Sequence, residues 1–398
     1  MRSGWQLSDL DFDEQLQGRA QRIRDPVKRL RFLRRAMRLE QPAAVRLEQP
    51  AARRRRRIWQ LRWIAVGVVL FFASIRTVSD ASFLSPGRVA QPAPLHDDFP
   101  KVWLVEKTAD WELYSNGLRI ENRFLTSGRP RVYQAFPRLW RENPHWRWGA
   151  DPVGIVFHSS ESELASFEPE QTGLLKRQGL GLLEHVRRHG LYHFVVDRFG
   201  RVQRVVEEST QADHAGQSVW ADAEWIYLNL NASFLGIAFE AQTRTEAGQG
   251  PINPAQVHAG KVLVEMLRSR YRIPVGNCVT HAQVSVNGHN FRIGYHTDWA
   301  EGFPFREVGL PDNYGLPLPS VCLFGFHCDP VFLDSAGAHL RSGLLLAEEQ
   351  IKREALVRGI TPARYRADLN RRYRRISLET ISDRAALESR AALEEKQQ

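Results

Sequence analysis

The stretch "GIVFHSS", Gly154 to Ser160, decides the fold prediction, because a short apolar run of this kind is typical of a strand buried inside a sheet. A second such run, "FLGIAFEA", covers Phe234 to Ala241. Between them, "YHFVVDRFGRVQRVVEE", Tyr192 to Glu208, predicts two strands joined by a turn at Phe199 and Gly200. Together these runs predict a sheet of short, largely buried strands.

Two segments with helical spacing accompany these strands. "TGLLKRQGLGLLEHVRRHG", Thr172 to Gly190, ends in a glycine, which commonly terminates a helix. "NPAQVHAGKVLVEMLRSRY", Asn253 to Tyr271, begins with an asparagine and a proline, which favour the cap and the first turn of a helix. Strands and helices therefore alternate to about residue 275, and we expect an α/β fold with a central mixed β-sheet flanked by helices.

The composition predicts a substantial core and argues against a nucleic-acid-binding domain. The 398 residues are 43% hydrophobic, and the formal net charge is +10. Most of the basic excess lies before residue 77 and after residue 340, so the middle of the chain is close to balanced. Because a nucleic-acid-binding domain gathers basic residues on its folded surface, we expect no nucleic-acid partner.

The N-terminal part predicts one membrane-spanning helix before the compact domain. Residues 1–57 are polar and arginine-rich, and "RRRRR", Arg53 to Arg57, leads directly into "IWQLRWIAVGVVLFFASI", Ile58 to Ile75. This apolar segment has about the length of a short membrane span if Arg62 reaches the interface. We expect an uncleaved signal anchor over residues 58–76, in preference to a cleaved signal peptide, because the segment before it is long. The basic segment then stays in the cytoplasm, and the rest of the chain is translocated.

The remaining organisation is expected to comprise a linker, a domain and a tail. Residues 77–100 are rich in proline and small residues, which is typical of a linker. The domain is expected over residues 101–330, beginning with a β-hairpin that turns at Asn116 and Gly117. Residues 331–398 are charged and helix-forming, and they predict a solvated helix, with contact to anionic lipid or cell-wall polymer as the alternative.

The cysteines leave two interpretations open. Cys322 and Cys328 are close enough in sequence to close a small disulfide loop if the compartment is oxidising. The alternative is that all three cysteines, Cys278 included, are small buried side chains. The sequence alone does not decide between them.

Candidate chemistry comes from three residues that lie far apart in the chain. His158 ends the first apolar strand, and functional side chains of α/β sheets gather at such strand ends. His281 follows the second long helix, and Asp298 follows the loop "THAQVSVNGHNFRIGYHTDW". Two imidazoles and one carboxylate can hold a tetrahedral zinc ion and leave its fourth position open for water, as catalytic zinc sites do.

The order of motifs resembles the type 2 N-acetylmuramoyl-L-alanine amidases, which share their fold with the peptidoglycan recognition proteins. The matching pieces are "GIVFHSS", "YHFVVDRFGRV" followed by "ADHAG", "FLGIAFEA", and "THAQ" through "HTDWAEGFPF". They extend over about residues 150 to 305. The resemblance implies zinc bound by His158, His281 and Asp298, and hydrolysis of the amide between N-acetylmuramic acid and L-alanine by a metal-activated water. It also implies peptidoglycan or muropeptide as substrate and, with the predicted anchor, a single-pass protein of the bacterial inner membrane with a periplasmic domain.

The resemblance also implies roles for residues around the metal. Tyr192 matches a tyrosine that lies beside the zinc-bound water in some members, and His214 in "ADHAG" matches a histidine of the substrate groove. His296 stands two positions before the third ligand, where the family commonly has a lysine that stabilises the oxyanion. An imidazole could donate a hydrogen bond there, but its charge would depend on pH.

Two further departures concern the general base and the loop. Ala238 stands where some amidases carry a glutamate, and Glu240 lies two residues on, on the same face of the strand. Glu240 is therefore either the general base or a structural carboxylate. The loop from His281 to Asp298 is longer than in better-known members, and His289 within it is expected to be solvated or to line the groove.

Two competing functions remain. The first is a non-catalytic module, anchored in the membrane, that recognises peptidoglycan, since the same fold can bind without cutting; retention of all three ligands favours catalysis. The second is a mononuclear iron site, in which His296 and Asp298 would need a distal histidine such as His327 or His339. It leaves His158 and His281 unexplained. The sequence contains neither the H-E-x-x-H nor the G-x-S-x-G signature of other hydrolases.

Overall fold

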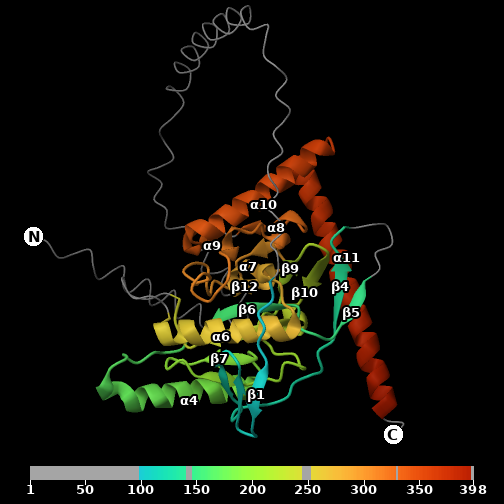
Figure 1. The fold of residues 1–398 in the computed structure, drawn as a ribbon. Helices are drawn as coiled ribbons and strands as arrows, with labels where there is room; N and C mark the ends of the chain where they lie inside the picture. The colour runs from blue at the N-terminus through green and yellow to red at the C-terminus, as the bar shows by residue number, and fades with distance from the viewer. Residues whose placement is uncertain (1–97, 140–145, 244–251, 329, 396–398) are drawn as a thin grey trace, which may run out of the picture. The chain divides into compact units, whose positions relative to one another are not determined.

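A computed structural model describes residues 98–139, 146–243, 252–328 and 330–395 (Figure 1). The chain separates into residues 1–91 and residues 92–398, and every described residue lies in the second part. The predicted Arg-rich segment, membrane anchor and most of the linker fall outside the described residues.

A central eight-stranded mixed sheet forms the framework, as predicted. The parallel strands β7, β11, β6 and β12 lie at its centre and one end, and the strands of the N-terminal extension continue it at the other end, where β3 pairs with β8 in parallel. The predicted turn at Asn116 and Gly117 joins β2 to β3, and Gly117 has a φ of +84°, which a glycine adopts without strain. In sheet order the strands are β1 (Leu104–Lys107), β2 (Trp111–Tyr114), β3 (Arg119–Glu121), β8 (Val202–Arg204), β7 (Phe194–Val196), β11 (Phe234–Phe239), β6 (Gly154–Ser159) and β12 (Cys278–Thr280).

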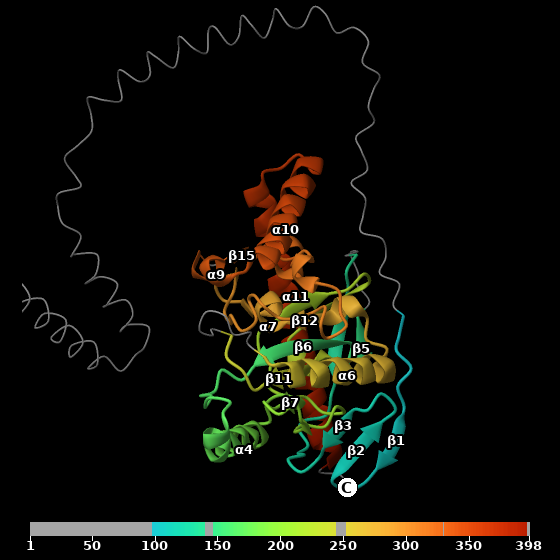
Figure 2. The same cartoon turned by 60° about the vertical axis from the view of Figure 1, so that its left-hand side comes forward.

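The two predicted helices are α4 (Thr172–His189) and α6 (Pro254–Tyr271). Gly190 ends α4 in the left-handed conformation, and Asn253 caps α6 by accepting the amide of Gln256 at 3.0 Å. Leu183 and Val186 of α4 pack with Ala238 of β11, whereas Leu263 and Leu267 of α6 pack in the main core with Phe157 and Ile237. Because neighbouring residues of a strand point to opposite faces, α4 and α6 cover opposite faces of the sheet (Figures 1 and 2).

A second, four-stranded sheet shares the α4 side with the first helix. Its core residues Tyr133, Trp220 and Tyr227 pack with Val156 of β6 and Phe234 of β11. The second sheet and α4 therefore both cover the face of the central sheet on which Val156 and Ala238 lie. In order its strands are β5 (Arg147–Gly149), β4 (Tyr133–Pro137), β10 (Trp225–Leu228) and β9 (Val219–Ala221).

Residues after 330 are more than a solvated tail. Helix α10 (Ala338–Val357) buries Leu340, Leu344, Ala347 and Ile351 in the main core, and α11 (Pro362–Glu395) adds further buried side chains such as Ile376. Arg372 of α11 donates to the Arg138 carbonyl at 3.2 Å, at the end of β4. The prediction of a helix is confirmed, but one face of each helix is packed, because apolar residues recur on it at helical spacing.

The remaining elements are short and connect the layers. A three-stranded sheet links the His281–Asp298 loop to the C-terminal part, because β14 pairs with β15 in parallel. The elements are β13 (Val286–Asn287), β14 (Arg292–Ile293), β15 (His327–Cys328), α5 (Leu230–Ser233), α7 (His281–Val284), α8 (Pro319–Cys322), α9 (Pro330–Ser335) and the 3-10 turns η3 (Pro169–Gln171), η4 (Val275–Asn277) and η5 (Asn313–Gly315).

A buried charge cluster ties the extension to β8; we call it the Arg204 cluster and define it as Arg204, Glu112 and Glu208. Arg204 Nη2 lies 2.8 Å from Glu112 Oε2, and its Nε lies 3.0 Å from Glu208 Oε2. All three side chains are at most 7% exposed. Burial alone would raise the pKa of Glu112, but the hydrogen bond and charge of Arg204 outweigh it and lower that pKa to about 2.

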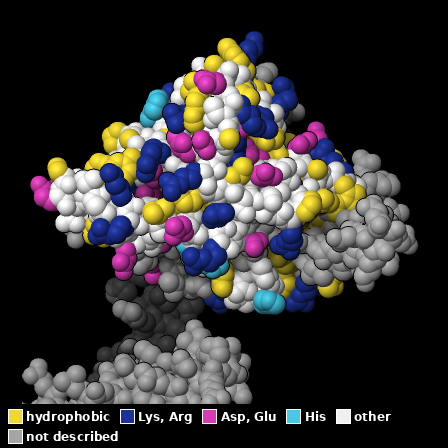
Figure 3. Space-filling model, turned by 90° about the horizontal axis from the view of Figure 1, so that it is seen from below, with side chains coloured by type: hydrophobic (Ala, Val, Ile, Leu, Met, Phe, Trp, Pro, Cys, Tyr) yellow, Lys and Arg dark blue, Asp and Glu magenta, His cyan; other side chains and the backbone are white. Residues whose placement is uncertain are grey.

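Outside this cluster, charged groups of both signs are mixed over the surface. Figure 3 shows lysine and arginine side chains interspersed with acidic ones on the face seen from below. In this view, the described part of the chain presents no continuous basic surface.

Two predictions about the chain are corrected, and the question that the sequence left open about the cysteines is answered. Within the described residues, no helix has both the length and the apolarity that a membrane crossing requires. The predicted fold class is therefore wrong in including a membrane-spanning helix, and the predicted single-pass location in the inner membrane is wrong with it; the segment 58–76 itself lies outside the described residues. The cysteines are present as thiols, so the Cys322–Cys328 disulfide is not formed.

Candidate metal centre

The register of two parallel strands brings His158 and His281 together. Strand β12 pairs with β6 so that Thr280 lies opposite Phe157, which places the next residue of each strand side by side. Thr280 caps α7, and its amide donates to Gln283 Oε1 at 2.9 Å, so His281 is fixed as the first residue of a helical turn. The two imidazole rings are 4.5 Å apart between centroids.

Asp298 completes the cluster from the far end of the loop. Its backbone carbonyl accepts the amide of Ala282 at 3.2 Å, which fixes the residue against α7. Its Oδ2 lies 3.2 Å from His158 Nδ1, and its Oδ1 lies 2.8 Å from His281 Nδ1. One ligand atom from each of the three residues lies within 4.8 Å of the others. Two nitrogens and one oxygen that converge in this way are a donor set suited to zinc.

The electrostatics of these groups fits metal binding. Burial, followed by the nearby His281, lowers the pKa of His158 to about 4, so this imidazole is neutral near pH 7. Burial alone would raise the pKa of Asp298, but His281 and His158 outweigh it and hold that pKa well below its usual range. Neutral imidazole and ionised carboxylate are the forms that metal ions bind.

A cavity of about 930 Å³ opens beside the cluster. This volume suits a small-molecule site. Residues from several elements line it, and they include His281, Asp298, Tyr192, His214, His296 and Glu161. The structure thus brings six of the seven predicted site residues together, counting His158 behind the cavity wall.

Tyr192 and His296 flank the two histidine ligands. The Tyr192 ring lies 4.9 Å from that of His158, and burial, followed by Asp298, raises the pKa of its phenol. His296 stacks on His281, with centroids 4.5 Å apart and planes at 21°. Burial, followed by His281, lowers the pKa of His296. Both side chains are therefore neutral near pH 7, and each has an O–H or N–H group that can donate a hydrogen bond.

Glu240 is the predicted site residue that lies away from the cavity. It follows the last residue of β11 and lies on the same side of the sheet as Ala238, because Gly179 of α4 lies against its carboxylate, but its Oε2 accepts the Arg198 amide at 3.0 Å. Burial raises its pKa. Its contacts within the described residues are those of a structural carboxylate.

Glu161 is a cavity residue that the sequence prediction missed. It lies three residues after His158 in the left-handed region, with a φ of 48°. Its Oε1 accepts the Ser159 hydroxyl at 2.5 Å and the Thr243 amide at 2.9 Å. The signal for Glu161 is its strained backbone directly after the strand that carries His158. Backbone strain is visible in the structure but not in the sequence.

The additional residues of the His281–Asp298 loop form a hairpin that lies away from the cluster of His158, His281 and Asp298. Strands β13 and β14 pair, and His289 lies exposed in the turn between them. Its backbone amide donates a hydrogen bond to Asn287 Oδ1 at 3.1 Å. His289 lines a neighbouring cavity instead of the metal cluster. This agrees with the prediction that it is not a ligand.

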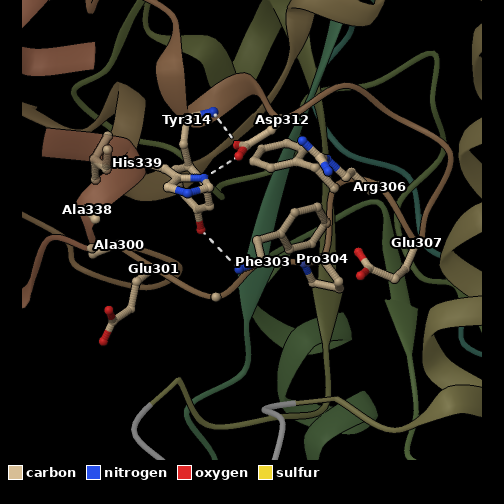
Figure 4. A pocket seen from close by; sticks show the side chains of 14 residues that line it. Ala300, Glu301, Phe303, Pro304, Arg306, Glu307, Asp312, Tyr314, Ala338 and His339 are labelled. Atoms are coloured by element: carbon tan, nitrogen blue, oxygen red, sulfur yellow. Dashed lines mark hydrogen bonds and ion pairs between the residues drawn. The ribbon is translucent and has the colours of Figure 1, made fainter. Parts of the chain in front are cut away.

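A separate cavity of about 520 Å³ adjoins the end of the ligand loop (Figure 4). Tyr314 lies in its wall; its hydroxyl donates to the Trp299 carbonyl at 2.8 Å and accepts the Phe303 amide at 3.1 Å, which anchors the chain directly after Asp298. His339 pairs there with Asp312. His339 is thus engaged away from His296 and Asp298, and the described residues contain one His/Cys/Asp/Glu group with metal-binding geometry, which argues against the iron interpretation.

The family match agrees with this site. Residues 148–299 match the family described as N-acetylmuramoyl-L-alanine amidase, which confirms the predicted resemblance for this segment, less than half of the chain. No curated protein is significantly similar to the chain in sequence.

Several solved structures also resemble the chain. The amidase LysC from Clostridium intestinale is 18% identical over 46% of this chain and 93% of its own, with a TM-score of 0.26. The amidase AmiD from E. coli, solved with an anhydromuramoyl peptide substrate, is 20% identical over 52% of this chain and 64% of its own, with a TM-score of 0.30. Drosophila peptidoglycan recognition protein SD is 16% identical over 40% of this chain and 84% of its own, with a TM-score of 0.25.

Proposed function

Because residues 148–299 match the N-acetylmuramoyl-L-alanine amidase family, we propose that this protein hydrolyses the amide between N-acetylmuramic acid and L-alanine in peptidoglycan or muropeptides. The observation that carries the proposal is the convergence of His158, His281 and Asp298 beside a cavity of about 930 Å³ inside that segment.

The metal of the proposed site is zinc, held by His158, His281 and Asp298. Their two nitrogens and one oxygen would supply three ligands, which is the number that catalytic zinc sites take from the protein. A zinc ion bound there would supply a Lewis acid that activates water and polarises the scissile carbonyl.

The chain's own residues would then orient the substrate and stabilise developing charge. Tyr192, a neutral phenol beside His158, is placed to donate a hydrogen bond or a proton at the reacting centre. His296, stacked on His281 where the family commonly has lysine, is placed to donate to the oxyanion. Glu240 is held by the Arg198 amide, and we assign it a structural role.

The decisive experiment is a product analysis of muropeptides digested by the full chain. The protein is stripped of metal with a chelator, divided, and assayed with and without added zinc. Mass spectrometry should show a free peptide and a free sugar acid only in the sample with zinc. These products identify an amidase, because the products of a glycosidase or an endopeptidase have different masses. The His158→Ala variant, which lacks one ligand, serves as the matched negative control.

Two outcomes would contradict the proposal. If the wild-type protein binds muropeptides with zinc present but releases no peptide, the chain is a recognition module. If metal analysis of the natively purified protein finds stoichiometric iron and no zinc, the zinc site is wrong.

A further inference from the structure

His214 lines the cavity and is held in place by several contacts with the rest of the protein. Asn231 Oδ1 accepts three successive backbone amides, from His214 at 3.0 Å, Ala215 at 2.6 Å and Gly216 at 3.0 Å. The imidazole packs against Gly236. A Cβ atom at position 236 would lie only 2.6 Å from His214 Cγ, so any larger residue there would clash with the ring. The side chain is 7% exposed.

Both ring nitrogens of His214 have defined partners. Nε2 lies 3.3 Å from the Phe234 carbonyl oxygen, and Nδ1 lies 3.2 Å from Nε2 of His158. A carbonyl oxygen only accepts, so Nε2 of His214 carries the proton, and Nδ1 of the neutral ring must accept. The proton between the two rings therefore belongs to Nε2 of His158.

This assignment leaves His158 Nδ1 with a lone pair, 3.2 Å from Asp298 Oδ2. Two acceptors then face each other at hydrogen-bond distance, which is favourable only when a cation lies between them. A partner on the outer nitrogen of a histidine ligand commonly fixes its tautomer in this way.

The Phe234 carbonyl is itself held from outside the family segment. Arg131, in the extension before β4, lies in the core at 2% exposure. Its Nη1 donates to the Phe234 carbonyl at 3.2 Å and to the Ala232 carbonyl at 2.6 Å, and its Nε donates to the Glu208 carbonyl at 2.8 Å. Within the described residues its partners are carbonyls and His193, with no carboxylate among them. A buried guanidinium without an acidic partner is costly to stability alone, which points to a positional task.

We propose that Arg131, the Phe234 carbonyl and His214 form a relay that fixes the tautomer and orientation of the metal ligand His158. His214 and Arg131 are thus positioning residues, and the extension preceding residue 148 is part of the metal centre. The proposal rests on the metal site of the proposed function, but not on the reaction catalysed there.

The test measures zinc affinity of the metal-free full chain, by competition with a chromophoric chelator and without substrate. His214→Phe keeps a ring of similar size but removes both nitrogens, and zinc affinity should fall by roughly 10–100-fold. His214→Gln offers one acceptor and one donor, as the neutral imidazole does, and should recover part of that loss. The absorption spectrum of bound Co²⁺, which reports ligand geometry, should change in the first variant more than in the second.

Arg131→Met tests the outer link, and Arg138→Met is its matched control. Arg138 ends the same segment and also donates to a carbonyl, that of Asp222 at 2.6 Å, but it does not contact the relay. Zinc affinity should fall in Arg131→Met and stay within about twofold of wild type in Arg138→Met. If Arg131→Met fails to fold, the comparison of His214→Phe with His214→Gln tests the relay without it.

Wild-type affinity and spectrum in His214→Phe would overturn the relay, and so would equal losses in His214→Phe and His214→Gln, which would show that the ring acts by packing alone. If wild-type protein binds zinc but does not cut muropeptides, the proposed function fails and the relay is still testable.

Discussion

Two buried polar clusters lie on opposite halves of one sheet, and they differ in how their charge is balanced. In the Arg204 cluster, on β8 and its neighbours, one guanidinium lies between two carboxylates, and Lys107 adds a further contact to Glu112 at 3.0 Å. At the other half, the carboxylate of Asp298 faces two imidazoles, of which His158 is neutral near pH 7. The first cluster contains a guanidinium, whereas the second pairs its carboxylate with imidazoles only.

This difference distinguishes charged groups that are buried to stabilise the fold from those that are buried at a binding site. Burying charge is tolerated when opposite charges and hydrogen bonds compensate it within the fold. The Arg204 cluster meets this condition with its own side chains, so its removal should affect stability. The cluster of His158, His281 and Asp298 contains no guanidinium or ammonium group, and its buried His281 Nε2 has no hydrogen-bond partner within the described residues. Its alteration should therefore affect binding before stability.

The largest expected effect comes from Asp298→Asn. The change removes the only negative charge of the metal centre while keeping the shape of the side chain. We expect zinc affinity to fall by more than about 100-fold, beyond the loss typical of an outer-shell residue, and muropeptide hydrolysis to disappear. Chelator competition and product analysis measure the two effects. Unchanged zinc affinity would mean that the cluster is not the metal site.

The matching change in the other cluster is Arg204→Met. It leaves Glu112 and Glu208 buried without their shared cation, and we expect the free energy of unfolding to fall by about 3–5 kcal/mol. Urea denaturation of the metal-free protein measures this loss. Zinc affinity of the folded protein should stay within about twofold of wild type, because the two clusters are independent. A parallel loss of zinc affinity would break the comparison.

A smaller effect is expected from acid. The pKa of Glu112 is lowered from 4.5 to about 2 in the folded protein, so its contribution to stability is complete above about pH 4.5 and is lost as pH falls toward 2. Wild type should therefore lose more stability between pH 5 and pH 2 than the Glu112→Gln variant, as measured by urea midpoints at several pH values. Parallel curves for the two proteins would show that Arg204 does not hold this carboxylate ionised.

The smallest effect is expected from Glu240→Gln. An amide still accepts the Arg198 amide proton, so the local structure should persist. A general base contributes about 10²–10⁴-fold to rate, so a turnover number within about threefold of wild type would identify Glu240 as structural. A loss of 100-fold would restore it as the base. Glu161→Gln, at the cavity, is the informative comparison in the same assay.

Sequence reasoning predicted the sheet, its main helices and the grouping of His158, His281 and Asp298, because these depend on local pattern and on motif order. Apolar runs predicted β6 and β11, and the cap residues Asn253 and Gly190 predicted the helix ends. His158 and His281 could be proposed as neighbours because parallel strands end at one edge of a sheet.

The rest depended on contacts between distant segments. Alternation placed Glu240 on the same side of the sheet as Ala238, but the Arg198 amide that donates to its carboxylate comes from a different turn. The relay from Arg131 to His214 passes through a backbone carbonyl, which has no side-chain signature in the sequence. The helical tail was predicted to be solvated because its charge is obvious, whereas its packed face required knowledge of the core it covers.

The hydroxyl of Tyr314 on the Trp299 carbonyl has a consequence for how this protein can be divided. The segment that matches the family ends at residue 299, yet the hydrogen bond that holds the chain after Asp298 comes from residue 314, and the guanidinium that contacts the Phe234 carbonyl comes from residue 131. The segment that matches the family is therefore shorter than the segment whose contacts hold the site together, and fragments of this chain should be cut outside residues 131 and 314.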